Sequence, residues 1–126
     1  MKLLSFHRLS VITSVLFISL AIILMFTPTL MLTGWGVELT TSVGLVVKRI
    51  AALYTGLAVM FYFVRNAEHS TTRTALIYGT ITGCTLLACL GIYEFVIGHA
   101  TSGILSAVFI EVALMLAFIY VGVRRK

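Results

Sequence analysis

Four long apolar stretches, separated by shorter and more polar links, dominate the hydrophobic pattern of this chain. They cover about residues 10–27, 43–64, 74–97 and 103–123. A helix needs about 20 mainly apolar residues to cross roughly 30 Å of hydrocarbon, and each stretch reaches or approaches that length. The pattern predicts an all-α polytopic membrane protein with one domain, residues 1–126, built as a four-helix transmembrane bundle. Because the last three stretches are joined by short links, neighbouring helices should be antiparallel.

Composition excludes a soluble protein of the usual kind. Of the 126 residues, 60% are hydrophobic and 10% are charged, and the mean hydropathy is +1.13. Soluble domains carry roughly a quarter charged residues, and a short chain cannot hide this much apolar surface in its own core. The net charge of +5 does not indicate nucleic acid, because the basic residues flank apolar stretches and no aromatic–basic interleaving is present. The expected partner is membrane lipid.

The first apolar stretch has an alternative interpretation as a signal peptide, because Lys2 and Arg8 precede it. The stretch is long for a signal peptide, however, and no small-x-small cleavage site follows Phe26. We expect it to be retained as a transmembrane helix.

Basic residues lie beside alternate links, which predicts the orientation of the chain. Links with more Lys and Arg stay in the cytoplasm. With four spans, seven basic residues fall on one side: Lys2, Arg8, Arg65, Arg73, Arg124, Arg125 and Lys126. The opposite links hold Glu38 and His99 and no Lys or Arg. Both termini should therefore be cytoplasmic, and a dual topology is excluded.

The link from Pro28 to Ser42 is too apolar for a simple exposed loop. It contains Leu30, Met31, Leu32 and Trp35, interrupted by Gly34 and Gly36. Tryptophan favours the membrane interface, where its ring is half buried and its N–H is hydrated. We expect a short interfacial segment between the first two transmembrane helices. The alternative is a lid over the mouth of the bundle.

Small residues four positions apart predict where the helices pack closely. Such pairs are Ala52–Gly56, Gly79–Gly83 and Gly103–Ala107. Arg49 should share the face of Ala52 and Gly56, and Glu111 should continue the face of Gly103 and Ala107. Both charges are therefore expected to look into the bundle.

Charged residues inside the apolar stretches are the best candidates for a site, because charge in a bilayer needs a partner or water. In a four-span topology Lys48, Arg49, Glu94 and Glu111 reach the outer half of the membrane from three helices. Lys48 should snorkel outwards, while Arg49 has two carboxylate partners to choose from. The cluster is either a structural clamp or a ligand-binding site. Its predicted residues are Arg49, Glu94, Glu111, Tyr54 and Tyr93.

No cofactor or metal is predicted. His7, His69 and His99 do not stand at metal-ligand spacing. Cys84 and Cys89 point apart on a helix and form no C-x-x-C redox motif. The sequence identifies no catalytic residue.

A resemblance to a known family follows from several residues together. A helix ending in Phe26-Thr27-Pro28 leads to a connector with Gly and Trp, and then to Lys48-Arg49-x-x-Ala52-Leu53-Tyr54-x-Gly56-Leu57. This pattern resembles small bacterial membrane proteins of the DoxX-like superfamily. The resemblance implies a four-helix bundle in the bacterial inner membrane and no settled activity. The wider architecture is similar to that of membrane sterol isomerases and sigma-2-type receptors, which bind sterols and lipidic amines.

The sequence therefore favours a binding or accessory membrane protein with a polar intramembrane site, whose ligand would be a lipidic or amine small molecule. The first alternative is a membrane-embedded enzyme that acts on a lipidic substrate with Glu111 as acid or base. A more distant one is a small proton-coupled transporter, but the first helix lacks the embedded glutamate typical of small multidrug transporters. The sequence is also compatible with a homo-oligomer.

Overall fold

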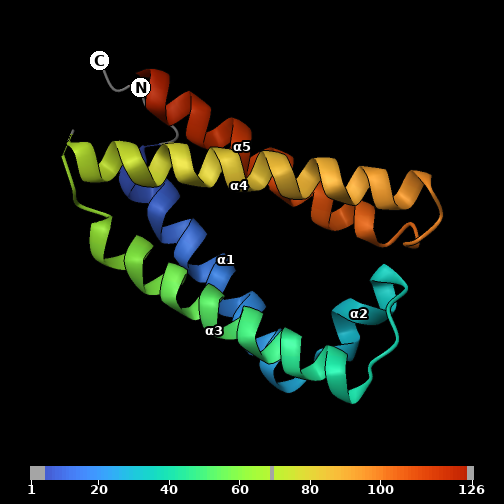
Figure 1. Ribbon diagram of the computed structural model, residues 1–126. Coiled ribbons are helices and arrows are strands. Elements are labelled where there is room, and N and C mark those ends of the chain that lie inside the picture. The colour runs from blue at the N-terminus through green and yellow to red at the C-terminus, as the bar shows by residue number, and fades with distance from the viewer. Residues whose placement is uncertain (1–4, 69, 125–126) are drawn as a thin grey trace.

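The computed structural model describes residues 5–68 and 70–124, and this part of the chain is helical with connecting turns (Figure 1). Its helices are α1 (Phe6–Phe26), α2 (Thr29–Trp35), α3 (Thr41–Val64), α4 (Thr71–Val96) and α5 (Ile104–Arg124). Four of them, α1, α3, α4 and α5, are long and apolar enough to cross a membrane. The all-α fold with four spanning helices is thus confirmed, and α2 is the short segment between the first two spans.

Three of the spanning helices begin earlier than their apolar stretches do. Ser5, Thr40 and Ser70 cap α1, α3 and α4, each accepting a hydrogen bond from a backbone N–H three residues later at 3.1–3.3 Å. A capping hydroxyl satisfies a backbone donor that has no partner within the helix. The helices therefore extend into polar residues that hydropathy alone assigns to the links.

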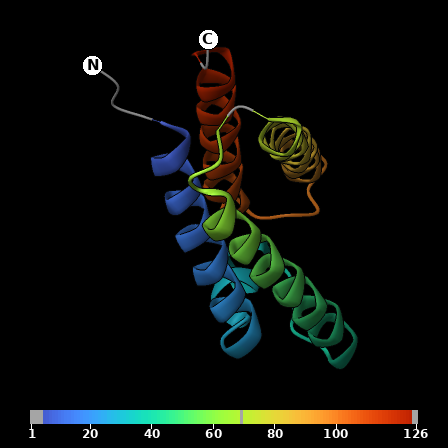
Figure 2. The ribbon, with the colours of Figure 1, turned by 90° about the vertical axis from the view of Figure 1, so that its left-hand side faces the viewer.

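The helices associate as two pairs. α1 packs along α3, and α4 packs along α5, while α1 of the first pair also contacts α5 of the second. The pairs are close where α1 and α4 begin and α3 and α5 end, which we call the narrow end. They diverge toward the opposite wide end, where α2 lies (Figure 1). A view turned by 90° shows the same separation of α3 from α4 (Figure 2).

An apolar core joins all four spanning helices toward the narrow end. Its members are Phe6, Leu9, Phe17, Ala58, Phe61, Ile77, Cys84, Leu114, Phe118 and Val121. Three rings form what we call the aromatic junction. The ring of Phe61 lies 6.0 Å from that of Phe17 and 5.6 Å from that of Phe118. The junction links α1, α3 and α5, so it fixes the point where the two pairs meet.

A second apolar cluster stabilises the wide end, and its members come from α1, α2 and α3. Leu24, Leu32, Val47 and Ala51 are buried in it, and Trp35 and Tyr54 are half-buried against it. Among the described residues it includes none from α4 or α5. α2 is thus packed against the α1–α3 pair by apolar side chains. The α4–α5 pair contacts α2 through hydrogen bonds from Thr101.

The predicted small-residue contacts are mostly wrong. A Cβ atom added at Gly56, Gly79 or Gly83 would meet nothing within 4 Å, whereas one added at Gly91 would lie 2.6 Å from Val108. Gly91 therefore lets α4 approach α5 closely. Lipid solvates an apolar helix face as well as a neighbouring helix does, so small-residue spacing cannot tell a packed face from a lipid-facing one.

Candidate functional site

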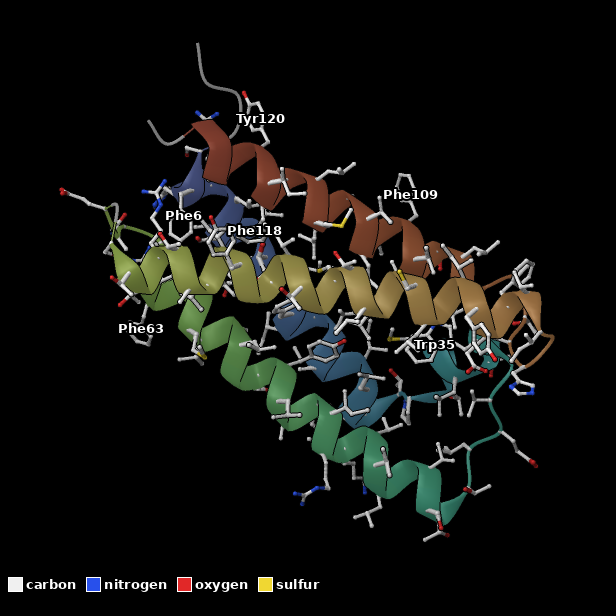
Figure 3. The ribbon with its side chains drawn as sticks, turned by 45° about the horizontal axis from the view of Figure 1, so that its top comes forward. Phe6, Trp35, Phe63, Phe109, Phe118 and Tyr120 are labelled. Carbon is white, nitrogen blue, oxygen red and sulfur yellow. The ribbon has the colours of Figure 1, made fainter. Side chains whose placement is uncertain are left out.

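Glu111 lies on the packed side of α5, about 10 Å along the helix axis from Ile104 at the wide end. Val108, Leu114 and Phe118 share its side of the helix and are buried, while Glu111 is half-buried. Figure 3 shows the contrast along α5, since Phe118 points toward the other helices and Phe109 points away from them. As predicted, Glu111 looks into the bundle.

Two side chains from other helices, Tyr54 of α3 and Cys84 of α4, lie within electrostatic range of the Glu111 carboxylate. Tyr54 is held by Phe17, whose ring centroid lies 5.4 Å away. Three helices from both pairs therefore meet around this carboxylate. Glu111 forms no hydrogen bond and no ion pair with any residue that the structure describes.

The structure does not bring Arg49 to this carboxylate, and the predicted Arg49–carboxylate pair is wrong. Arg49 is exposed, as is Lys48. The buried residues of α3 are Val47, Ala51, Ala58 and Phe61. Arg49 is rotated by about 200° from Val47 and so lies on the opposite side of α3. The error came from treating Ala52 and Gly56, which are also exposed, as the packing face.

Glu94 also has a different partner from the one expected. Its Oε1 lies 2.9 Å from Nδ1 of His99 in the link between α4 and α5, and the backbone N–H of His99 donates to the Glu94 carbonyl at 2.9 Å. Because His99 follows closely in sequence, this local pair forms without another helix. Tyr93 is 59% exposed. Of the five predicted site residues, the structure brings Glu111 and Tyr54 together and places Arg49, Glu94 and Tyr93 elsewhere.

Two neighbours of the candidate site were not anticipated. No role beside Glu111 was predicted for Cys84, yet it lies within electrostatic range of both Glu111 and Tyr54. The signal was present in the spacing of Ile77, Cys84 and Ala88, which forms the buried stripe of α4. One helical turn beyond Glu111, the Met115 sulfur lies 2.9 Å from the Thr85 hydroxyl oxygen, whose proton is donated to the Ile81 carbonyl at 2.7 Å. This contact ties α5 to α4 beside the site.

The region around Glu111 is bounded differently at its two ends. Toward the narrow end, the aromatic junction and its apolar neighbours fill the space between the pairs. Toward the wide end lies α2, with Trp35 directed between the pairs (Figure 3). Thr101, in the link between α4 and α5, contacts α2: its hydroxyl donates to the Gly34 carbonyl at 2.5 Å, and its N–H donates to the Trp35 carbonyl at 3.2 Å. These two hydrogen bonds join α2 to the link between α4 and α5.

The described residues hold no group of three His, Cys, Asp or Glu side chains able to bind a metal ion. His7 contacts the Arg65 carbonyl at 3.3 Å near the narrow end, whereas the Glu94–His99 pair lies at the wide end. His69, the third histidine of the sequence, lies outside the described residues, as do Lys2, Arg125 and Lys126.

Comparisons with known proteins add no relative: no family model, no curated protein and no solved structure matches this chain.

Proposed function

We propose that this protein is a membrane-embedded binding protein whose site is centred on Glu111 and whose ligand is a cationic lipidic molecule. One observation carries the proposal. Glu111 is a half-buried carboxylate within a membrane-spanning helix, and it has no hydrogen bond or ion pair with any described residue. Because a charge at this depth is unfavourable without compensation, a ligand that brings a positive charge would stabilise the folded protein.

The neighbours of Glu111 suit such a ligand. An ammonium group beside the carboxylate would gain from the weak screening between the helices, and the ring of Tyr54 offers a face for a cation–π contact. The remaining neighbours, Cys84 and Met115, are apolar and polarisable. An alkyl or ring system attached to the amine would therefore extend toward the lipid and contact apolar side chains.

The packing favours binding over transport. A transporter would need a polar path from Glu111 to the other side of the membrane. Toward the narrow end the described residues place the aromatic junction, with Phe61 and Phe118 1% and 0% exposed. This aromatic barrier lies between Glu111 and the narrow end, where the hydroxyls of Ser10 and Thr13 are buried. A ligand would therefore reach Glu111 from the wide end or from lipid.

We further propose that the protein resides in the bacterial inner membrane with both termini in the cytoplasm, and that it is related to the DoxX-like superfamily, as its sequence pattern suggests. The charges of the narrow end support this orientation. Arg73 lies 4.4 Å from the ring centroid of Phe6, and Arg65 lies 3.9 Å from that of Tyr62. Arginines anchored at one end of the spans are what a cytoplasmic face requires.

Glu111→Gln tests the proposed site, with Glu94→Gln as the matched control. The glutamine is isosteric but cannot neutralise a cation, while Glu94 pairs locally with His99 and is not expected to contact the ligand. Native mass spectrometry of each protein, purified in mild detergent, should show a retained amine-bearing lipid in wild type and in Glu94→Gln but not in Glu111→Gln. Thermal unfolding measured in parallel shows whether Glu111→Gln stays folded. Equal retention by all three proteins would reject the site.

A further inference from the structure

The short helix α2 is bounded on both sides by residues suited to a hinge. Pro28 precedes it and has no backbone N–H with which to continue the hydrogen bonding of α1. Gly36 ends it with φ +82°, a left-handed conformation that glycine adopts without strain. Between these two residues, Leu32 is buried among side chains of α1 and α3. α2 is thus attached to one helix pair by apolar contacts and joined to the chain at two points where the backbone direction changes.

The other helix pair meets α2 through a small polar latch, which we define as Thr101 with the carbonyls of Gly34 and Trp35. The Thr101 hydroxyl donates to Gly34 at 2.5 Å, and its N–H donates to Trp35 at 3.2 Å. Gly103 approaches Gly34 so closely that a Cβ atom there would overlap the Gly34 backbone. Two hydrogen bonds and one close glycine contact therefore join the two helix pairs at the wide end.

The link that carries Thr101 is itself well fixed. Gly98 turns the chain with φ +86°, and His99 returns to Glu94 through both a backbone and a side-chain contact at 2.9 Å each. The link therefore stays with α4 when the latch opens, and α2 moves away from it together with the ends of α1 and α3 to which Leu32 attaches it. A net hydrogen bond stabilises by about 1 kcal/mol, so two of them can hold a segment closed and still release it on a functional timescale.

We infer that α2 is a gate across the wide end, and that release of Gly34 and Trp35 from Thr101 opens the way to Glu111. The identity of the ligand rests on the proposed function, whereas the movement of α2 does not. Trp35 and Tyr54 pack against the same apolar cluster, so displacement of α2 removes cover directly from the residues around the carboxylate. Closure after binding would enclose the ligand between α2 and the aromatic junction.

A disulfide across the latch tests the gate. A Cβ atom added at Gly36 would lie 3.6 Å from the Cβ atom of Thr101, within the range of about 3.5–4.5 Å found in disulfides. The variant Gly36→Cys/Thr101→Cys is made with Cys89→Ser, so that Cys84, beside Glu111, is the one remaining native thiol. The readout is the rate at which N-ethylmaleimide alkylates Cys84 in nanodiscs. It is measured on the oxidised protein and on protein whose new disulfide has been cleaved by a reductant that is removed before alkylation. N-ethylmaleimide also alkylates the two engineered cysteines once their disulfide is cleaved. Peptide mass spectrometry distinguishes alkylation at those positions from alkylation at Cys84.

The gate predicts that alkylation of Cys84 is at least about tenfold slower in the oxidised protein than in the reduced protein. Equal rates, or no alkylation of Cys84 in either form, would overturn it. Since a side chain at position 36 is strained, Thr101→Val provides a second test without a new cysteine. Loss of its hydroxyl should speed Cys84 alkylation about fivefold, whereas Ser106→Ala, which removes a local hydroxyl bond to Gly103 at the same end, should not.

These outcomes are independent of the ligand. If Glu111 binds nothing but the gate exists, Cys84 alkylation still responds to the latch while amine retention is equal in wild type and Glu111→Gln. If the site exists without a gate, retention depends on Glu111 and alkylation does not respond to the latch.

Discussion

Phe61 of α3 and Phe118 of α5 face one another at the point where the two helix pairs meet, with ring centroids 5.6 Å apart and both side chains fully enclosed. Because this contact joins the pairs directly, it should contribute strongly to the stability of the bundle. It also separates the region around Glu111 from the narrow end.

Phe118→Ala should destabilise the fold by about 2 kcal/mol. The change leaves a cavity, but its cost is smaller than in a soluble core because lipid already solvates the separated helices. Phe109→Ala on the same helix is the control, since Phe109 is 75% exposed and its removal should cost less than about 0.5 kcal/mol. Thermal unfolding in one detergent compares the two. A larger loss for Phe109→Ala would mean that the outer face of α5 is a contact surface.

Ser14→Ala should cost about 0.5–1.5 kcal/mol, the range found for interhelical hydrogen bonds in membranes. The Ser14 hydroxyl donates to the Ala58 carbonyl at 2.7 Å and so joins α1 to α3. Ser19→Ala is matched to it, because Ser19 donates to the Val15 carbonyl within its own helix. The same unfolding measurement should separate the two variants, and equal effects would contradict the described α1–α3 contact.

Arg49→Leu should leave the melting temperature nearly unchanged. Arg49 is exposed and forms no ion pair with the described residues, so its removal leaves no buried carboxylate without a partner. An interhelical clamp would instead lose a few kcal/mol when one member is removed. A fall in melting temperature as large as that of Phe118→Ala would restore the clamp hypothesis.

Reporter fusions at the two termini should both show a cytoplasmic location. Seven of the nine Lys and Arg residues flank that side in a four-span topology, and basic flanks are retained in the cytoplasm. Alkaline phosphatase and a cytoplasm-active fluorescent protein give opposite signals at each terminus. A periplasmic C-terminus with a cytoplasmic N-terminus would require an odd number of spans, and two periplasmic termini would invert the bundle; either result contradicts the prediction.

Hydropathy predicted the architecture well because lipid demands long apolar helices whatever they pack against. The four spans and the short segment after Pro28 follow from that demand. The helix starts at Thr41 and Thr71 were missed because capping by the hydroxyls of Thr40 and Ser70 is a local hydrogen-bond effect that hydropathy does not measure.

The site was predicted less well, and the reason is specific to membranes. Glu111 lies where the sequence placed it, on the inner side of α5, and Tyr54 lies near it. Arg49 was misplaced because Ala52 and Gly56 were assumed to mark the packed face of α3. In water the polar face of a helix identifies its exposed side, but in lipid both sides are apolar. Only tertiary packing could show that Val47 and Ala51 form the contact face.

The central claim is that Glu111 binds a cationic amphiphile between the helix pairs, and fluorescence quenching of Trp35 tests it most directly. Trp35 is the one tryptophan of the sequence, and it lies at the wide end beside the proposed site. Wild type and Glu111→Gln in nanodiscs are titrated with bromoundecyltrimethylammonium, and with bromoundecanoate as the anionic match. We predict saturable quenching of wild type by the cation alone, and binding weakened at least about tenfold in Glu111→Gln. Superimposable curves for the two proteins with the cation would contradict the claim.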